Sequence, residues 1–142
     1  MIVFHAGLVK IEEFYIPYGG LHFGGIRSAL ECALRHLHYG NLKHRNLDTI
    51  HIHKCELLSD SFYESEDKGG DHSWKTLNDE LFEKDIYFDI IKYTNEHEPD
   101  IVPSYCIFRT DLVRILEHST MHMDIAEDIL NGIIDDEYRY IQ

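Results

Sequence analysis

The chain has few cysteines, few prolines and no long apolar run. Its 142 residues include three cysteines and three prolines. The cysteines are far apart and form no C-x-x-C pair, so neither a disulfide framework nor a thiolate zinc site is favoured. No apolar run approaches the ~18–20 residues needed to cross a bilayer, and the N-terminus lacks the basic and apolar regions of a signal peptide. The sequence therefore predicts a cytoplasmic protein with reduced thiols and no membrane contact.

Positive charge is also scarce. The chain carries 13 lysines and arginines against 26 aspartates and glutamates, a formal net charge of −13. Such a chain repels phosphates, so direct nucleic-acid binding through a basic face is not expected. The charge suits a protein partner with a basic surface, because complementary potentials speed encounter. The plainer alternative is that the acidic residues simply keep the protein in solution.

The chain contains enough apolar residues to build a hydrophobic core. Hydrophobic residues make up 44% and aromatics 12% of the sequence, which argues against disorder. The length predicts one domain spanning residues 1–142. Several short strands with two or three helices indicate an α+β fold rather than a βαβ alternation.

The hydrophobic pattern places these elements along the chain. Strands are expected at residues 1–5, 47–57, 86–95, 104–108 and 112–116. Apolar residues recurring three and four apart predict a helix over residues 26–37, and a second helix is expected over 74–85, capped by Ser73. Residues 59–73 are predicted to be a surface loop, and residues 119–142 an acidic helical tail.

The motifs of several enzyme classes are missing. There is no G-x-S-x-G elbow, no phosphate-binding P-loop and no dinucleotide fingerprint. Eleven histidines raise the question of a metal site. His118 and His122 would share a helix face, but Ser119 stands where a zinc protease has its glutamate. His51 and His53 point the same way from a strand, yet no third ligand follows, so a metal protein is the weakest hypothesis.

Three separated pieces of sequence carry a resemblance. The first is VFHAG (residues 3–7), at the end of the first expected strand. The second is GGLHFGGIRSALECAL (residues 19–34), a short aromatic strand that runs into a helix. The third is YTNEHE (residues 93–98) followed by SYCIF (residues 104–108). In this order, over roughly residues 1–117, they resemble the ADP-ribosyltransferase superfamily, in particular its small prokaryotic and phage-encoded members, which include the anti-CRISPR ADP-ribosyltransferases.

The resemblance implies a split β-sandwich with peripheral helices that holds NAD, as a substrate, between its two sheets. His5 takes the position of the histidine that hydrogen-bonds the adenosine ribose, and Ala6 and Gly7 would offer backbone groups to the nicotinamide amide. His22 and Phe23 occupy the second motif, where an aromatic ring stacks on nicotinamide. The chain has HAG where the family has H-G-[ST], and His22 where a tyrosine is frequent.

The third motif supplies the predicted catalytic carboxylate. Glu98 matches the family's acidic residue near the reacting ribose, with Glu96 as the neighbouring candidate. Breaking the nicotinamide–ribose bond builds positive charge on the sugar, which a fixed carboxylate stabilises best where water is excluded. Asn95 shares this loop between two strands, where scaffolds place reacting groups. Arg27, at the start of the first helix, is the candidate for the pyrophosphate.

The resemblance implies an NAD-dependent mono-ADP-ribosyltransferase that modifies a protein target, of the kind phages encode as effector or anti-defence proteins. Transfer to a nucleobase and simple NAD hydrolysis are open variants of this hypothesis. The alternative is a non-catalytic acidic protein that blocks a basic nucleic-acid-binding surface of a partner, through its −13 charge, the acidic loop at residues 64–71 and the acidic tail. NAD consumption separates the two, because a charge mimic needs neither NAD nor Glu98.

Overall fold

The computed structural model of the chain describes residues 1–39, 48–96 and 102–132. In these ranges the chain forms an α+β fold of two sheets and three α-helices. The strands are β1 (Ile2–Gly7), β2 (Leu21–Phe23), β3 (Thr49–Leu57), β4 (Phe62–Ser65), β5 (Ile90–Tyr93), β6 (Ser104–Ile107) and β7 (Val113–His122). The helices are α1 (Ile26–Tyr39), α2 (Asp71–Glu83) and α3 (Met123–Leu130). None of the helices described is both long and apolar enough to cross a bilayer.

The first sheet is antiparallel, with the order β1–β3–β7. Ile50 and Ile52 are buried on its inner face beneath α1 and α3. Because side chains alternate along a strand, the histidines between and after them point to the opposite face. On that face His5, His53 and His118 are direct cross-strand partners and form one row. The strand predicted over residues 47–57 is confirmed over Thr49–Leu57, with its alternation as far as a register shift between Lys54 and Cys55.

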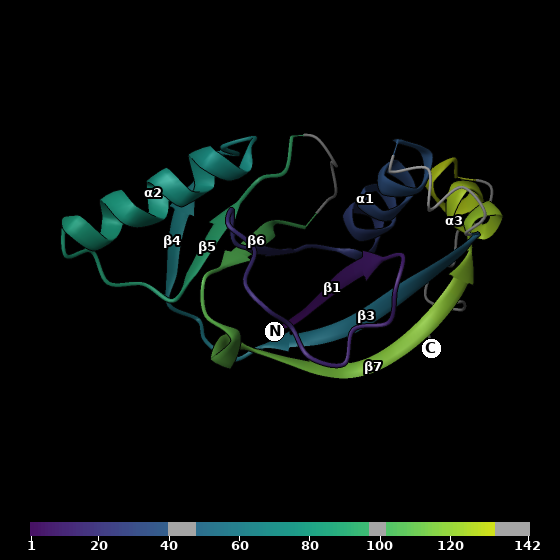
Figure 1. Cartoon of the computed structure of the whole chain (residues 1–142), viewed down its shortest axis with the longest axis horizontal. Helices are drawn as coiled ribbons and strands as arrows, with labels where there is room; N and C mark the ends of the chain where they lie inside the picture. Colours follow the sequence, from purple (N-terminus) through teal and green to yellow (C-terminus); the bar gives the residue numbers. More distant parts are fainter. Residues whose placement is uncertain (40–47, 97–101, 133–142) are drawn as a thin grey trace.

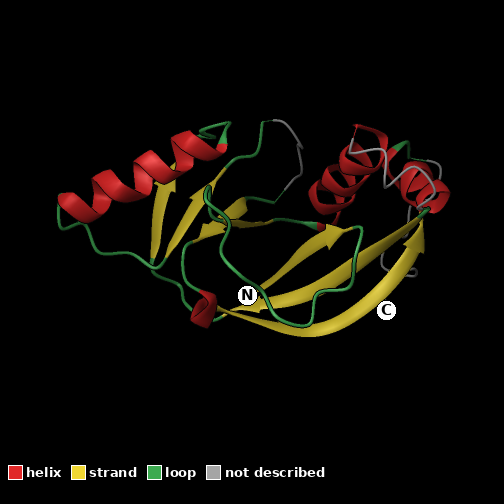
Figure 2. Ribbon diagram, in the orientation of Figure 1, coloured by secondary structure: helices red, strands yellow, loops and turns green. Residues whose placement is uncertain are grey.

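The second sheet has the order β2–β6–β5–β4 and is covered by α2. Trp74, Leu77 and Leu81, spaced three and four residues apart, are the buried side chains of this helix and pack with Ile91 and Tyr93 of β5. Strands β4 and β5 are parallel and are connected through α2, so the fold contains one βαβ unit. In Figure 2 the three α-helices lie along one side of the molecule and the long strands of the first sheet along the other.

Among the described residues, the two sheets are joined by one backbone bridge, between Phe4 and Gly24. Each residue donates its N–H to the carbonyl of the other, at 2.8 and 3.2 Å. A Cβ atom on Gly24 would lie 3.1 Å from Ser104 Oγ and 3.2 Å from Ser28 Cβ. A side chain at this position would press on Ser104 and Ser28, so a glycine suits the close approach of this bridge to β6 and α1.

The helix expected over residues 26–37 is confirmed and ends at Tyr39, whereas three other predictions need correction. Residues 59–73 are not a loop throughout, since they contain β4 and the first turn of α2. Helix α2 begins at Asp71, with Gly70 rather than Ser73 at its N-cap. The strand expected over residues 86–95 is limited to β5.

The predicted helical tail is wrong at its start. Strand β7 continues to His122 and α3 begins at Met123, so His118 lies on a strand and not on a helix. The strand expected over residues 112–116 is the first part of β7, and its continuation was missed because β7 is an edge strand that buries little: of its ten residues, only Met121 is buried. The rest of the predicted tail, residues 133–142, lies outside the described residues.

Candidate functional site

An open cleft of about 500 Å³ lies where the two sheets meet. Its walls come from β1, β2, the middle of α1, the first turn of α2 and the end of β5. Figure 1 shows α1 and the N-terminal end of α2 on either side of this region. Five of the seven residues predicted to contact the cofactor line the cleft: His5, Ala6, His22, Phe23 and Asn95. The other two, Gly7 and Arg27, do not.

His5 presents a neutral imidazole at the cleft wall. The rings of Phe14 and Phe23 meet it edge-on, with centroids 5.4 and 6.0 Å away. Burial, and to a smaller extent the positive charge of neighbouring histidines, lowers the pKa of His5 from 6.5 to about 4. Its Nδ1 atom is buried and has no hydrogen-bond partner among the described residues. An orphaned polar atom beside a cleft is a contact that a ligand hydroxyl can satisfy.

Ser104 is a second such group, and the sequence reasoning missed it. It is the first residue of β6, is 1% exposed and has a buried Oγ without a hydrogen-bond partner in the part of the chain that the structure describes. It lines the cleft directly beneath Gly24. The available signal was a hydroxyl at the head of an otherwise apolar strand, SYCI.

His22 and Phe23 leave β2 on opposite faces, because they are adjacent in a strand. His22 Nε2 donates to the Gly19 carbonyl at 3.0 Å, and its Nδ1 pairs with the Tyr93 hydroxyl at 2.7 Å. A carbonyl can only accept, so Nε2 carries a proton. Phe23 is 3% exposed and packs against His5, so it offers little ring surface to a ligand. Of the two, the half-buried His22 is the ring that a ligand can reach.

Of the two predicted catalytic glutamates, Glu98 lies outside the described residues, and Glu96 does not line the cleft. Glu96 is exposed on the loop after β5, and its backbone N–H donates to Asp67 Oδ2 at 2.9 Å. Among the described residues, the carboxylates that line the cleft are Asp67 and Asp71, which were not among the predicted site residues.

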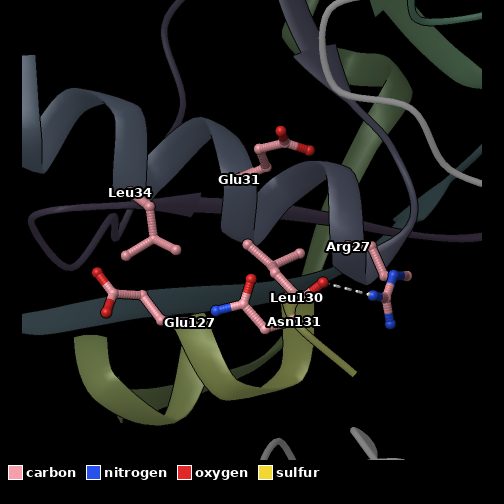
Figure 3. Close-up of a pocket in the computed structure, with 6 residues that line it drawn as sticks. All are labelled: Arg27, Glu31, Leu34, Glu127, Leu130 and Asn131. Atoms are coloured by element: carbon pink, nitrogen blue, oxygen red, sulfur yellow. Dashed lines mark hydrogen bonds between the residues drawn. The ribbon is translucent and has the colours of Figure 1, made fainter. Parts of the chain in front are cut away.

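Arg27 faces away from the cleft. Its Nη2 donates to the carbonyls of Ile129 and Leu130, both at 3.2 Å, and so caps the C-terminal end of α3. Figure 3 shows it at the edge of a separate hollow of about 410 Å³ between α1 and α3. The arginine that lines the cleft is Arg35, an exposed residue further along α1, with His36 beside it. Arg27 and Arg35 both belong to α1. Arg27 contacts the end of α3, and Arg35 lines the cleft, a difference that the sequence of α1 alone does not show.

His51, His53 and His118 pack together on the first sheet and do not line the cleft. His51 Nδ1 and His118 Nε2 are 2.9 Å apart and share a hydrogen bond between nearly parallel rings. His53 is fully buried, and its Nε2 accepts the Ile11 N–H at 2.9 Å, which ties the loop after β1 to the sheet. Within the described ranges, no three His, Cys, Asp or Glu side chains are arranged to hold a metal ion.

Comparisons of the chain with protein-family models, with curated proteins and with solved structures gave no match.

Proposed function

We propose that the cleft binds NAD and that the protein is an NAD-dependent mono-ADP-ribosyltransferase acting on a protein target. The observation that supports this most is the convergence of His5, Ala6, His22, Phe23 and Asn95, from three separate segments, on one cleft. The cleft's volume of about 500 Å³ is within the range of small-molecule and cofactor sites. Two sheets joined at one bridge, with the cleft at their junction, suit the split β-sandwich of that family.

The residues present fit a dinucleotide. The buried, unpartnered His5 Nδ1 and Ser104 Oγ are suited to sugar hydroxyl or amide groups, which both donate and accept hydrogen bonds. Arg35 brings positive charge to the cleft for a pyrophosphate. His22, fixed by Gly19 and Tyr93, offers a ring of defined orientation.

NAD supplies the electrophile, a ribose whose bond to nicotinamide is weak, and the protein's part is binding and orientation. Positive charge that develops on the ribose is stabilised by a nearby carboxylate. We assign this role to Glu98, with Glu96 as the neighbouring candidate. Asp67 and Asp71 add negative charge at the cleft wall. The net charge of −13 favours a basic protein as acceptor over a nucleic acid.

Nicotinamide release from NAD, measured with and without histone as a basic acceptor, tests this function. We expect release by the wild type and a loss of about 100-fold or more in Glu98→Gln with NAD binding retained. The matched control is Glu31→Gln, which lies in the α1–α3 hollow and should leave the rate unchanged. Absence of release and of acceptor labelling in the wild type would remove the enzyme and leave the acidic inhibitor as the alternative.

A further inference from the structure

The C-terminal end of α2 presents an unusual group of exposed apolar side chains. Phe82 is 82% exposed, Tyr87 91% and Ile86 40%. They lie within six consecutive exposed residues, 82–87. Figure 1 places this end of α2 at the far side of the molecule from α1 and α3, and none of the three residues lines the cleft. Clustered exposed aromatics mark interaction surfaces more often than isolated ones do.

This group, which we call the α2 tip (Phe82, Ile86 and Tyr87), has a defined backbone. The N–H of Asp85 donates to the Phe82 carbonyl at 3.1 Å, and the N–H of Ile86 donates to the Leu81 carbonyl at 3.0 Å. Asp85 has φ = 56°, so these bonds form the Schellman ending of a helix. A fixed turn presents the aromatic side chains without the entropy cost of ordering a free loop on binding.

The border of the α2 tip carries a net negative charge. Glu80, Glu83 and Asp85 are exposed and have no ion-pair partner among the described residues, against one exposed lysine, Lys84. Asp79, on the same helix, is neutralised by Lys75 at 2.9 Å. The combination of an apolar centre and a charged border is the arrangement of a protein-binding surface.

We propose that the α2 tip docks a folded protein whose surface has an apolar socket bordered by lysine and arginine. A basic border complements Glu80, Glu83 and Asp85. Nucleic acid and anionic membranes carry the same sign of charge as this border and are repelled by it. A second copy of the chain, at a net charge of −13, is disfavoured for the same reason. The docking does not depend on the ligand of the cleft, because the two surfaces share no residue.

Site-specific photocrosslinking tests this proposal. A benzoylphenylalanine is placed at Tyr87 in one sample and at Tyr15 in another, in an extract of cells that express the chain. Tyr15 is the matched control, since it is 78% exposed, lies close to Glu12 and Glu13 in the sequence and is in the loop after β1. We expect an adduct with a basic protein from position 87 and none from position 15.

The crosslinked protein is then purified and titrated with the wild type and two variants. Removal of both aromatic side chains in Phe82→Ser/Tyr87→Ser should weaken binding about tenfold or more. Glu80→Gln/Glu83→Gln should reduce the salt dependence of the association rate. All of these side chains are exposed, so folding is retained. Equal adducts at both positions, an adduct with a second copy of the chain, no adduct, or titrations unchanged in both variants would overturn the proposal.

Discussion

The two faces of the first sheet are built from the same three strands but differ in chemistry. The face beneath α1 and α3 is apolar and dry, with Ile50 and Ile52 at its centre. The opposite face carries the row of His5, His53 and His118, which are cross-strand partners. The first face is apolar throughout its centre, whereas on the second the histidine row lies beside the buried side chains of Val3, Cys55 and Leu57. Of that row, only His5 lines the cleft among the described residues, so the proposed binding site lies at one end of the row.

The largest expected difference between the faces is in stability. Ile52 is 1% exposed in the apolar cluster, so Ile52→Ala should lower the free energy of unfolding by about 3 kcal/mol. His118→Leu, on the other face, should change it by less than about 1 kcal/mol, because its ring is half-buried and its partner His51 can turn to water. Urea denaturation measures both. Equal losses of free energy of unfolding in the two variants would show that the histidine row stabilises the fold as much as the apolar face does.

The histidine face should make the protein acid-sensitive through His5. Its pKa is lowered from 6.5 to about 4 on folding, so below pH 6.5 the unfolded chain binds a proton that the folded chain refuses. The contribution of His5 to the free energy of unfolding is therefore complete above pH 6.5 and is lost as the pH falls to about 4. A shift of this size corresponds to on the order of 3 kcal/mol.

Comparison with His5→Leu isolates this effect, since the carboxylates titrate in both proteins. We expect the free energy of unfolding to fall less steeply between pH 6.5 and 4 in the variant than in the wild type. His51 and His53, whose pKa values are also lowered by burial, remain in both proteins. Parallel curves for the two proteins would mean that His5 is not held neutral by its surroundings.

The smallest expected effect is on the reactivity of the cysteine thiols, which tests whether a ligand occupies the cleft beside His5. Burial raises the pKa of Cys55 to about 12 and also raises that of Cys106, so both thiols should be inert in the folded chain. Cys32 is partly exposed and lines the cleft with His5. Iodoacetamide should therefore modify Cys32 alone, and NAD at ten times its Kd should slow the reaction about tenfold.

Mass spectrometry of the native and the urea-unfolded chain checks this, the latter giving adducts at all three cysteines. An undiminished rate of Cys32 alkylation in saturating NAD would place the ligand elsewhere.

The elements that the sequence predicted well are those with a buried face. Helix α1 has apolar residues at helical spacing, and β3 alternates strictly between Ile50, Ile52 and the histidines, so periodicity reports both. The elements it missed, β4 and most of β7, are edge strands with no regular apolar face. Such strands are specified by the neighbour they pair with, which a local pattern does not contain.

The residues of the candidate site likewise fall into those that a local motif indicates and those that only the packing of distant segments brings to the cleft. His5 and His22 could be singled out because the motifs around them are local, although both lie within strands and β1 continues past His5 to Gly7. Ser104, Arg35 and Asp71 could not, because they reach the cleft through the packing of β6, α1 and α2 around it. Arg27 was assigned to the wrong place for the converse reason, since α3, which it caps, begins almost 100 residues further along the chain.

Calorimetric titration with NAD tests the central claim most directly. The wild type, His5→Leu and His118→Leu form the set, because both histidines belong to one row and His5 is the one that lines the cleft. We predict binding by the wild type, an unchanged affinity in His118→Leu, and a loss of about tenfold in His5→Leu, the value of one buried hydrogen bond. No heat from the wild type at millimolar NAD, or an equal loss in both variants, would contradict NAD binding in this cleft.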